Sequence, residues 1–168
     1  MPSSIPQIEL KNLKYAAFAS QETSCFEATV NLDGKRAGTV RNDGHGGCNM
    51  YHPWTINDTL EAIAKTLPNE TLDLGDGEKT EMPASADSII DNLLNDMLAR
   101  RDLQRALGKK VLYLHRAGGI YETKVLDKAR LAAVLTKPQQ FKDATAILNL
   151  LPFEDALKLY RSAAASAA

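Results

Sequence analysis

The segment from Asn42 to Trp54 gathers most of the residue types in this chain that could do chemistry. It contains three of the glycines, two of the three histidines, one of the two cysteines and the only tryptophan. Three kinds of chemistry suit this composition, namely anion binding by backbone amides, metal binding, and catalysis by a thiol. The candidate binding residues are Asn42, Asp43, Gly44, His45, Gly46, Gly47, Cys48, Asn49, Tyr51, His52 and Trp54.

Anion binding would use the backbone N–H groups of Gly44, Gly46 and Gly47. Glycine-rich loops that lead into a helix bind phosphate because their amides converge on it, and a helix is expected to start near Pro53. The segment lacks the Lys-Ser/Thr of a P-loop, and it does not match Gly-x-Gly-x-x-Gly after a parallel strand. The simpler interpretation is that these glycines only shape an irregular turn.

Metal binding would use His45, Cys48 and His52, whose side chains are all able to ligate zinc. A closed structural site needs a fourth ligand, which Cys25 or His115 supplies only if the fold brings one of them near. The sequence has no second pair of ligands at a suitable spacing. We therefore expect no metal and no cofactor.

Catalysis would use Cys48 as a nucleophile activated by His45 or His52. Asp43 and Asn49 are near in sequence, but neither is an evident orienting partner for the base. An inert thiol is the simpler interpretation, and we do not expect an enzyme. Two cysteines in a chain of this size do not form a disulfide framework, so both thiols are expected to be free.

The elements that would position this segment begin with a β-hairpin over residues 24–42. Asp33-Gly34 lies between two runs of alternating polarity, which is typical of a type I′ turn. That turn predicts four cross-strand pairs: Leu32–Lys35, Val30–Ala37, Ala28–Thr39 and Phe26–Arg41. The core face would then hold Phe26, Ala28, Val30, Leu32 and Ala37. Before the hairpin, a slip in the alternation near Lys11-Asn12 predicts a bulge.

The rest of the chain is predicted to be mainly helical. Apolar residues at helical spacing indicate a helix from about Pro53 to Leu67, which Thr55 could cap. Residues 68–85 are polar and are predicted to form a connector; its acidic residues do not follow the EF-hand register, so a solvated loop is expected. A long helix should follow, opening at Ser85 or Asp87 and running to about Leu107. The remaining predictions are a hairpin over Val111–His115 and Ile120–Val125, and helices over Leu126–Leu135, Phe141–Leu151 and Phe153–Arg161.

Bulk properties place this pattern in one α+β domain over residues 1–168, with a β-rich part at 1–53 and a mainly helical part at 54–168. The chain has 168 residues, of which 44% are hydrophobic and 24% charged. We expect an antiparallel sheet of three or more strands and a second hairpin, packed against several helices. The net charge of −1 gives no reason to expect nucleic acid as a partner. No apolar run reaches the roughly 20 residues that span a bilayer, and no signal peptide is visible, so a cytoplasmic location is expected.

The stretch from Ser20 to Pro53 carries a family resemblance. It includes Ser-Gln-Glu-Thr-Ser-Cys-Phe-Glu-Ala-Thr-Val, Asp-Gly-Lys, Gly-Thr-Val, Asn-Asp-Gly-His-Gly-Gly and Tyr-His-Pro. This text resembles small uncharacterised proteins encoded by phages, prophages and plasmids. The resemblance implies an accessory factor that binds and inhibits a host defence protein in the host cytoplasm, and it transfers no catalytic residue.

Three functional hypotheses follow. The first is a non-enzymatic binding protein that covers a partner's surface with the 42–54 segment and the 68–85 connector. The second is a small-ligand or nucleotide-binding protein that uses the glycine-rich loop at 43–49, and the third is a metal- or thiol-dependent hydrolase at His45, Cys48 and His52. Under the first, Tyr51 and Trp54 would be aromatic anchors for the partner. The alternative is that both rings face inward and fix the start of the helix.

Overall fold

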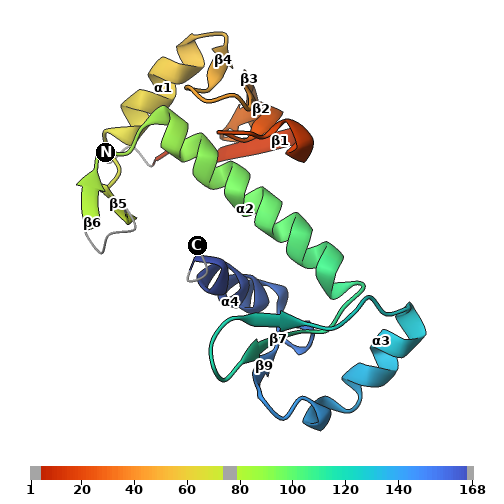
Figure 1. Ribbon diagram of the computed structural model, residues 1–168. Coiled ribbons are helices and arrows are strands. Elements are labelled where there is room, and N and C mark those ends of the chain that lie inside the picture. Colours follow the sequence, from red (N-terminus) through yellow and green to blue (C-terminus); the bar gives the residue numbers. More distant parts are fainter. Residues whose placement is uncertain (1–4, 74–78, 166–168) are drawn as a thin grey trace. The chain divides into compact units, whose positions relative to one another are not determined.

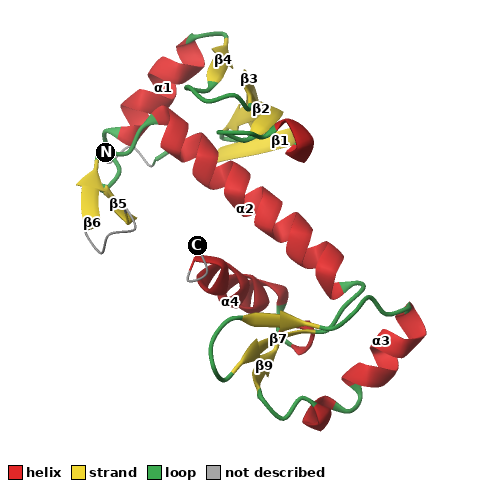
Figure 2. Ribbon diagram, viewed as in Figure 1, coloured by secondary structure: helices red, strands yellow, loops and turns green. Residues whose placement is uncertain are grey.

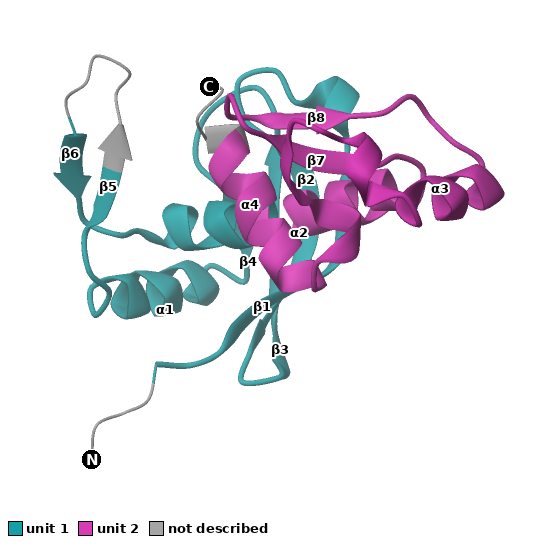
Figure 3. Cartoon of the chain, turned by 90° about the horizontal axis from the view of Figure 1, so that it is seen from below, with its two compact units in different colours: residues 1–95 teal, residues 96–168 magenta. Residues whose placement is uncertain are grey.

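The chain divides into two compact units, Met1–Asn95 and Asp96–Ala168 (Figure 3). The computed structural model describes residues 5–73 and 79–165. Antiparallel sheets, four α-helices and a helical C-terminal end make the fold α+β, as predicted (Figure 2). Among the described residues, no helix combines the length and the hydropathy that crossing a bilayer requires.

The first unit contains a four-stranded antiparallel sheet in the order β1-β2-β3-β4 (Figure 1). Its strands are β1 (Ile8–Tyr15), β2 (Cys25–Leu32), β3 (Lys35–Asp43) and β4 (Met50–His52), and a short 3-10 helix, η1 (Ala17–Ala19), lies between β1 and β2. The pairing of β1 with β2 shifts between Lys11 and Lys14, and Asn12 has a φ of 53°. The break in alternation therefore predicted the bulge correctly.

The hairpin of β2 and β3 turns at Asp33-Gly34, as predicted, with φ values of 48° and 76°. Leu32 pairs with Lys35, but after Asn31 the register shifts, so that Val30 lies opposite Gly38. The predicted pairs Val30–Ala37, Ala28–Thr39 and Phe26–Arg41 are therefore wrong by one residue. The cause is a bulge at Ala37, which leaves that residue without a partner and which no sequence pattern signals.

One face of this sheet packs against α1 (Thr55–Ala64) and the first turns of α2 (Ala86–Leu107). The predicted face is confirmed in part: Phe26, Ala28 and Val30 are buried, whereas Leu32 and Ala37 are only half-buried. The predicted cap of α1 is wrong, because Trp54 precedes the helix and no side chain caps it. The buried residues of this core include Leu10, Phe26, Ala28, Val30, Val40, Ile56, Leu60, Ile90 and Leu94.

The connector predicted over residues 68–85 instead contains a two-stranded hairpin. Its strands are β5 (Glu70–Asp73) and β6 (Lys79–Met82), which pair Asp73 with Lys79 and Leu72 with Thr80. Asp76 and Glu78, two members of the acidic run in this connector, lie outside the described residues. The charged residues that suggested a loop lie in these strands, whose described side chains are largely exposed. Because neither face is buried, the strands show no alternation of apolar residues that would identify them in the sequence.

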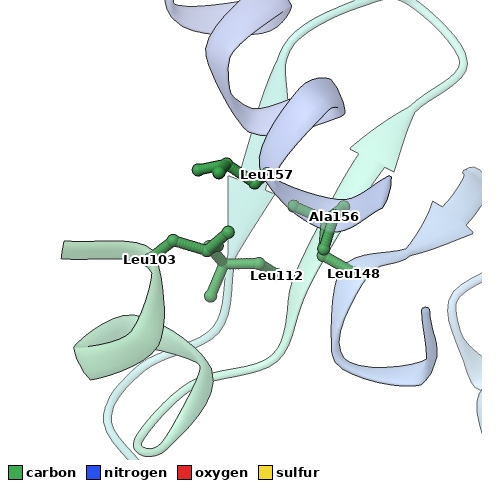
Figure 4. Close-up of a cluster of buried hydrophobic side chains, with 5 residues drawn as sticks. All are labelled: Leu103, Leu112, Leu148, Ala156 and Leu157. Carbon is green, nitrogen blue, oxygen red and sulfur yellow. The ribbon is translucent and has the colours of Figure 1, made fainter. Parts of the chain in front are cut away.

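The second unit contains the end of α2, a three-stranded sheet in the order β8-β7-β9, and two further helices. The elements are β7 (Leu112–His115), β8 (Ile120–Glu122), α3 (Lys128–Leu135), β9 (Ala144–Ile147) and α4 (Phe153–Ala165), with short 3-10 helices η2 (Pro138–Gln140) and η3 (Leu148–Leu150). Figure 4 shows that its core side chains point toward one another. They are Leu103, Leu112, Leu148, Ala156 and Leu157.

The helix predicted over Phe141–Leu151 is wrong. Residues Ala144–Ile147 form β9, which pairs with β7 at Tyr113–Ile147 and Leu114–Ala146. A strand that pairs with residues some thirty positions earlier gains hydrogen bonds that local apolar spacing cannot predict. The hairpin of β7 and β8 and the helix α4 are confirmed.

Candidate functional site

Asn42 organises the glycine-rich segment from inside the protein. Its side chain is 6% exposed. Its Oδ1 accepts hydrogen bonds from Thr23 Oγ1 at 2.7 Å and from the Gly44 amide at 3.0 Å. Its Nδ2 donates to the Gly47 carbonyl and to Asn49 Oδ1, both at 3.2 Å. A residue at the end of β3 thereby holds both ends of the loop.

Gly44 is required by the packing of this loop. Its carbonyl oxygen accepts from the amides of Gln21, Glu22 and Thr23 at 2.9–3.4 Å, so the loop before β2 folds onto it. A Cβ at Gly44 would collide with the Ala19 carbonyl oxygen, and its φ is +86°. The glycine is there for close approach and for a left-handed backbone.

A second set of hydrogen bonds ties β4 to the first turns of α2. The Tyr51 hydroxyl donates to Asp87 Oδ1 at 2.6 Å, and the Asn49 amide donates to Asp87 Oδ2 at 3.2 Å. Asn49 Nδ2 donates to Asp91 Oδ1 at 3.1 Å. Burial, with a further contribution from the Asp87 carboxylate, raises the pKa of the Tyr51 hydroxyl far above its ordinary value. Tyr51 is therefore a neutral, inward-facing hydrogen-bond donor.

Beside these hydrogen bonds lies a cavity of about 240 Å³, which we call the acidic cavity. Its charged groups are Glu22, Asp87 and Asp91, and Phe26 and Leu94 contribute apolar surface. Partial desolvation of the carboxylate raises the pKa of Asp91, and the nearby charge of Asp87 adds to this effect. The full lining is Glu22, Thr23, Ser24, Phe26, Asn42, Gly47, Asn49, Asp87, Asp91, Leu94 and Asn95.

In the described part of the first unit, no lysine or arginine lines this cavity. In the described part of that unit, the ion pairs are Lys11–Glu9 and Lys14–Glu27, and neither involves a residue that lines the cavity. The carboxylates are held instead by neutral donors from Asn49 and Tyr51. The lining therefore carries negative charge alone, which favours a cationic group.

Two of the three amides that were candidates for anion binding are used inside the loop. The Gly44 N–H donates to Asn42 Oδ1, and the Gly46 N–H donates to Thr23 Oγ1 at 3.2 Å. The carboxyl group of Glu22 lies next to Gly46 and lines the acidic cavity. A phosphate here would meet occupied donors and negative charge, so the geometry opposes an anion.

The exposed residues of the segment point to water rather than into the acidic cavity. Trp54 is 62% exposed and touches Tyr51 edge-on, with ring centroids 6.4 Å apart. His45 is exposed, with its Nδ1 3.3 Å from Gln21 Oε1. Tyr51 faces inward, as expected if the ring fixes the start of the helix. Trp54 faces outward, as expected of an anchor for a partner.

Asp43 and His52 line two other cavities. Asp43 borders one of about 380 Å³ with Lys14 and Arg41, and His52 borders one of about 480 Å³ with Arg41 and Met50. Charged residues of both signs line each of these cavities, so neither has the single sign of charge that the acidic cavity has.

The candidate metal ligands and the two thiols lie as follows in the described part of the chain. Among the described residues, no three His, Cys, Asp or Glu side chains form a group that could hold a metal, so His45, Cys48 and His52 are not brought together as ligands. Cys25 is half-buried and Cys48 is exposed, and both are free thiols.

Sequence reasoning missed the residues that complete the site. Thr23, Asp87 and Asp91 all contact the predicted segment, and Glu22 lines the same cavity. One signal was available: Asp87 and Asp91 are four positions apart on a predicted helix and must share a face. Which element that face meets depends on long-range packing.

Comparisons with known proteins identified no relative of this chain. No protein-family model matches the chain, and neither a curated protein nor a solved structure shows significant similarity to it.

Proposed function

We propose that this chain is a non-enzymatic binding protein, whose first unit captures a lysine or arginine side chain of a partner protein in the acidic cavity. The resemblance of residues 20–53 to proteins of phages and plasmids suggests the setting. In that setting the partner is a host defence protein, met in the host cytoplasm and inhibited by being covered.

The observation that carries this proposal is the negative charge of the cavity lining. Glu22, Asp87 and Asp91 line a space of about 240 Å³, and none of them forms an ion pair with a lysine or arginine in the described part of their unit. Phe26 and Leu94 provide apolar surface for the methylene stem of a long cationic side chain, while the carboxylates meet its charged end.

The charge of the whole first unit supports the same class of partner. Residues 1–95 contain 14 Asp and Glu residues against 7 Lys and Arg residues, a formal net charge of −7. A field of this sign attracts basic surfaces and accelerates their association.

The first unit also exposes two large aromatic side chains. Trp54 is 62% exposed, and Phe18 on η1 is 92% exposed. Exposed aromatic side chains of this size are frequent sources of binding energy at protein interfaces. They would add apolar area to a contact whose specificity comes from the cavity.

Calorimetric titration of the full chain with a short arginine-containing peptide tests the proposal. Asp91→Asn should weaken binding about 10- to 150-fold, since one charge-assisted contact is worth roughly 1.5–3 kcal/mol. The matched control is Asp58→Asn on the exposed side of α1, which changes the net charge equally but lies outside the lining of the cavity. Equal weakening by both variants would contradict the proposal, because it would mean that only net charge matters.

A further inference from the structure

The second unit has a charge opposite to that of the first. Residues 96–168 contain 13 Lys and Arg residues against 7 Asp and Glu residues, a formal net charge of +6. The whole-chain value of −1 hides this surplus. A unit of this charge attracts polyanions, whatever the first unit binds.

Four aromatic rings lie in a row in this unit. The ring of His115 lies 4.5 Å from that of Tyr121, Tyr121 lies 6.0 Å from Tyr113, and Tyr113 lies 5.1 Å from Phe141, each distance taken between centroids. The planes of His115 and Tyr121 differ by 31°, and those of Tyr113 and Tyr121 by 32°. These two pairs are closer to parallel than to edge-to-face, whereas the planes of Tyr113 and Phe141 differ by 46°.

The strand register explains why these rings share one face of the sheet. Tyr113 pairs with Tyr121 and also with Ile147, and cross-strand partners point to the same side. The neighbouring positions point to the other side, where Leu112 and Ile120 join the core that α4 covers. The aromatic face is therefore the face of this sheet opposite to its core.

This face is partly open, and its border carries two cationic side chains, Lys142 and Arg116, together with Asp143. Tyr121 is 49% exposed, and a cavity of about 340 Å³ lies among the rings. Lys142 is exposed and lines this cavity. Arg116 follows β7 and is paired with Asp143 at 2.6 Å, with most of its side chain exposed.

We propose that the aromatic face of the second unit binds single-stranded nucleic acid. Bases would stack on Tyr121 and its neighbouring rings, and Lys142 and Arg116 would contact phosphates. Stacking needs an exposed ring and tolerates any base sequence, while a surplus of positive charge tracks the backbone. A duplex keeps its bases stacked on one another, so it offers no free base to the rings. This proposal concerns a different unit from the cationic-partner proposal and does not depend on it.

Fluorescence anisotropy with a labelled 12-nucleotide oligothymidylate and the full chain tests this inference. The wild-type protein should bind the single strand, more weakly as salt rises, because phosphate contacts release counterions. Tyr121→Ala should weaken binding about 5- to 100-fold, and Tyr121→Phe should restore it, because phenylalanine keeps the stacking surface. Lys142→Glu should weaken binding and reduce its salt dependence.

Matched controls come from the first unit. Phe18→Ala removes an aromatic side chain that is even more exposed, and Lys35→Glu makes the same charge change as Lys142→Glu. Both should leave binding unchanged, as should Asp91→Asn, which separates this test from that of the acidic cavity. Three results would overturn the inference: no binding by the wild type, a loss in Phe18→Ala equal to that in Tyr121→Ala, or equal affinity for the matching duplex.

Discussion

At the scale of single residues, the glycine-rich segment is held by one buried amide. Asn42 uses both ends of its side chain to fix the positions of Thr23, Gly44, Gly47 and Asn49. An aspartate could not replace it, because the Nδ2 group makes two of these four hydrogen bonds. The glycines then serve the shape of the loop, which was the simpler of the interpretations that the sequence allowed.

Substitutions at two glycines distinguish the cost of a steric collision from the cost of backbone strain alone. Gly44→Ala should lower the free energy of unfolding by about 3 kcal/mol or more, since the new methyl collides with a backbone carbonyl in addition to the strain of a positive φ. Gly47→Ala should cost only about 1 kcal/mol, because its φ is +89° but its Cβ meets open space. Urea unfolding of the two variants measures the difference, and equal losses would contradict this account of the loop.

Asp91 should make stability depend on pH. Its pKa is raised above the ordinary 3.8, so between that value and the higher folded value the folded chain binds more protons than the unfolded chain. The contribution of Asp91 to stability therefore falls as pH rises through this window and is constant above it. Asp91→Asn keeps an oxygen acceptor for Asn49 and removes the charge.

The variant should consequently gain stability relative to the wild type as pH rises above the ordinary pKa of 3.8 and through the raised pKa of Asp91. The gain should stay below about 1 kcal/mol, because the Asp91 side chain is exposed and solvent screens its charge. Urea midpoints measured at several pH values check this, and parallel curves for the two proteins would count against a desolvated Asp91. If Asp91→Asn gains stability but loses binding of the peptide, Asp91 serves binding at a cost in stability.

At the scale of elements, local signals predicted what is locally determined. The Asp33-Gly34 turn, the bulge near Asn12 and the limits of α2 follow from backbone preferences and helical spacing, and the structure confirms them. The bulge at Ala37, the pairing of β9 with β7 and the hairpin of β5 and β6 depend on partners distant in sequence or on exposed strands. The contact of Asp87 with β4 also joins residues that are distant in sequence. The sequence therefore predicted the glycine-rich segment but not the helix residues that complete the site.

The turn between β2 and β3 gives a test at this scale. Gly34→Val should destabilise the fold by about 1 kcal/mol or somewhat more, because a β-branched residue resists a φ of 76°. Gly34 has free space around the position of a Cβ, so strain alone should account for the loss. Thermal unfolding compared with the wild type measures it, and an unchanged midpoint would be inconsistent with a left-handed residue at this turn.

At the scale of the whole molecule, the net charge does not reveal that the two units carry opposite charges. The formal charges are −7 for residues 1–95 and +6 for residues 96–168, so a net charge of −1 describes neither unit. The expectation that nucleic acid is not a partner was drawn from that average, and the proposal for the second unit contests it. Charge counted within each compact unit is the more informative quantity, but the boundary between the units becomes visible only in the structure.

The most direct test of the central claim is to observe the acidic cavity while a cation enters it. The side-chain amides of Asn42 and Asn49 line the cavity, and that of Asn49 donates to Asp91. In ¹⁵N-correlated NMR spectra of the full chain, an arginine-containing peptide should shift these two amide signals in a saturable way, and the same peptide with citrulline in place of arginine should not. Saturable shifts confined to other parts of the first unit, or identical shifts with the citrulline peptide, would contradict the claim that this cavity takes a cationic side chain.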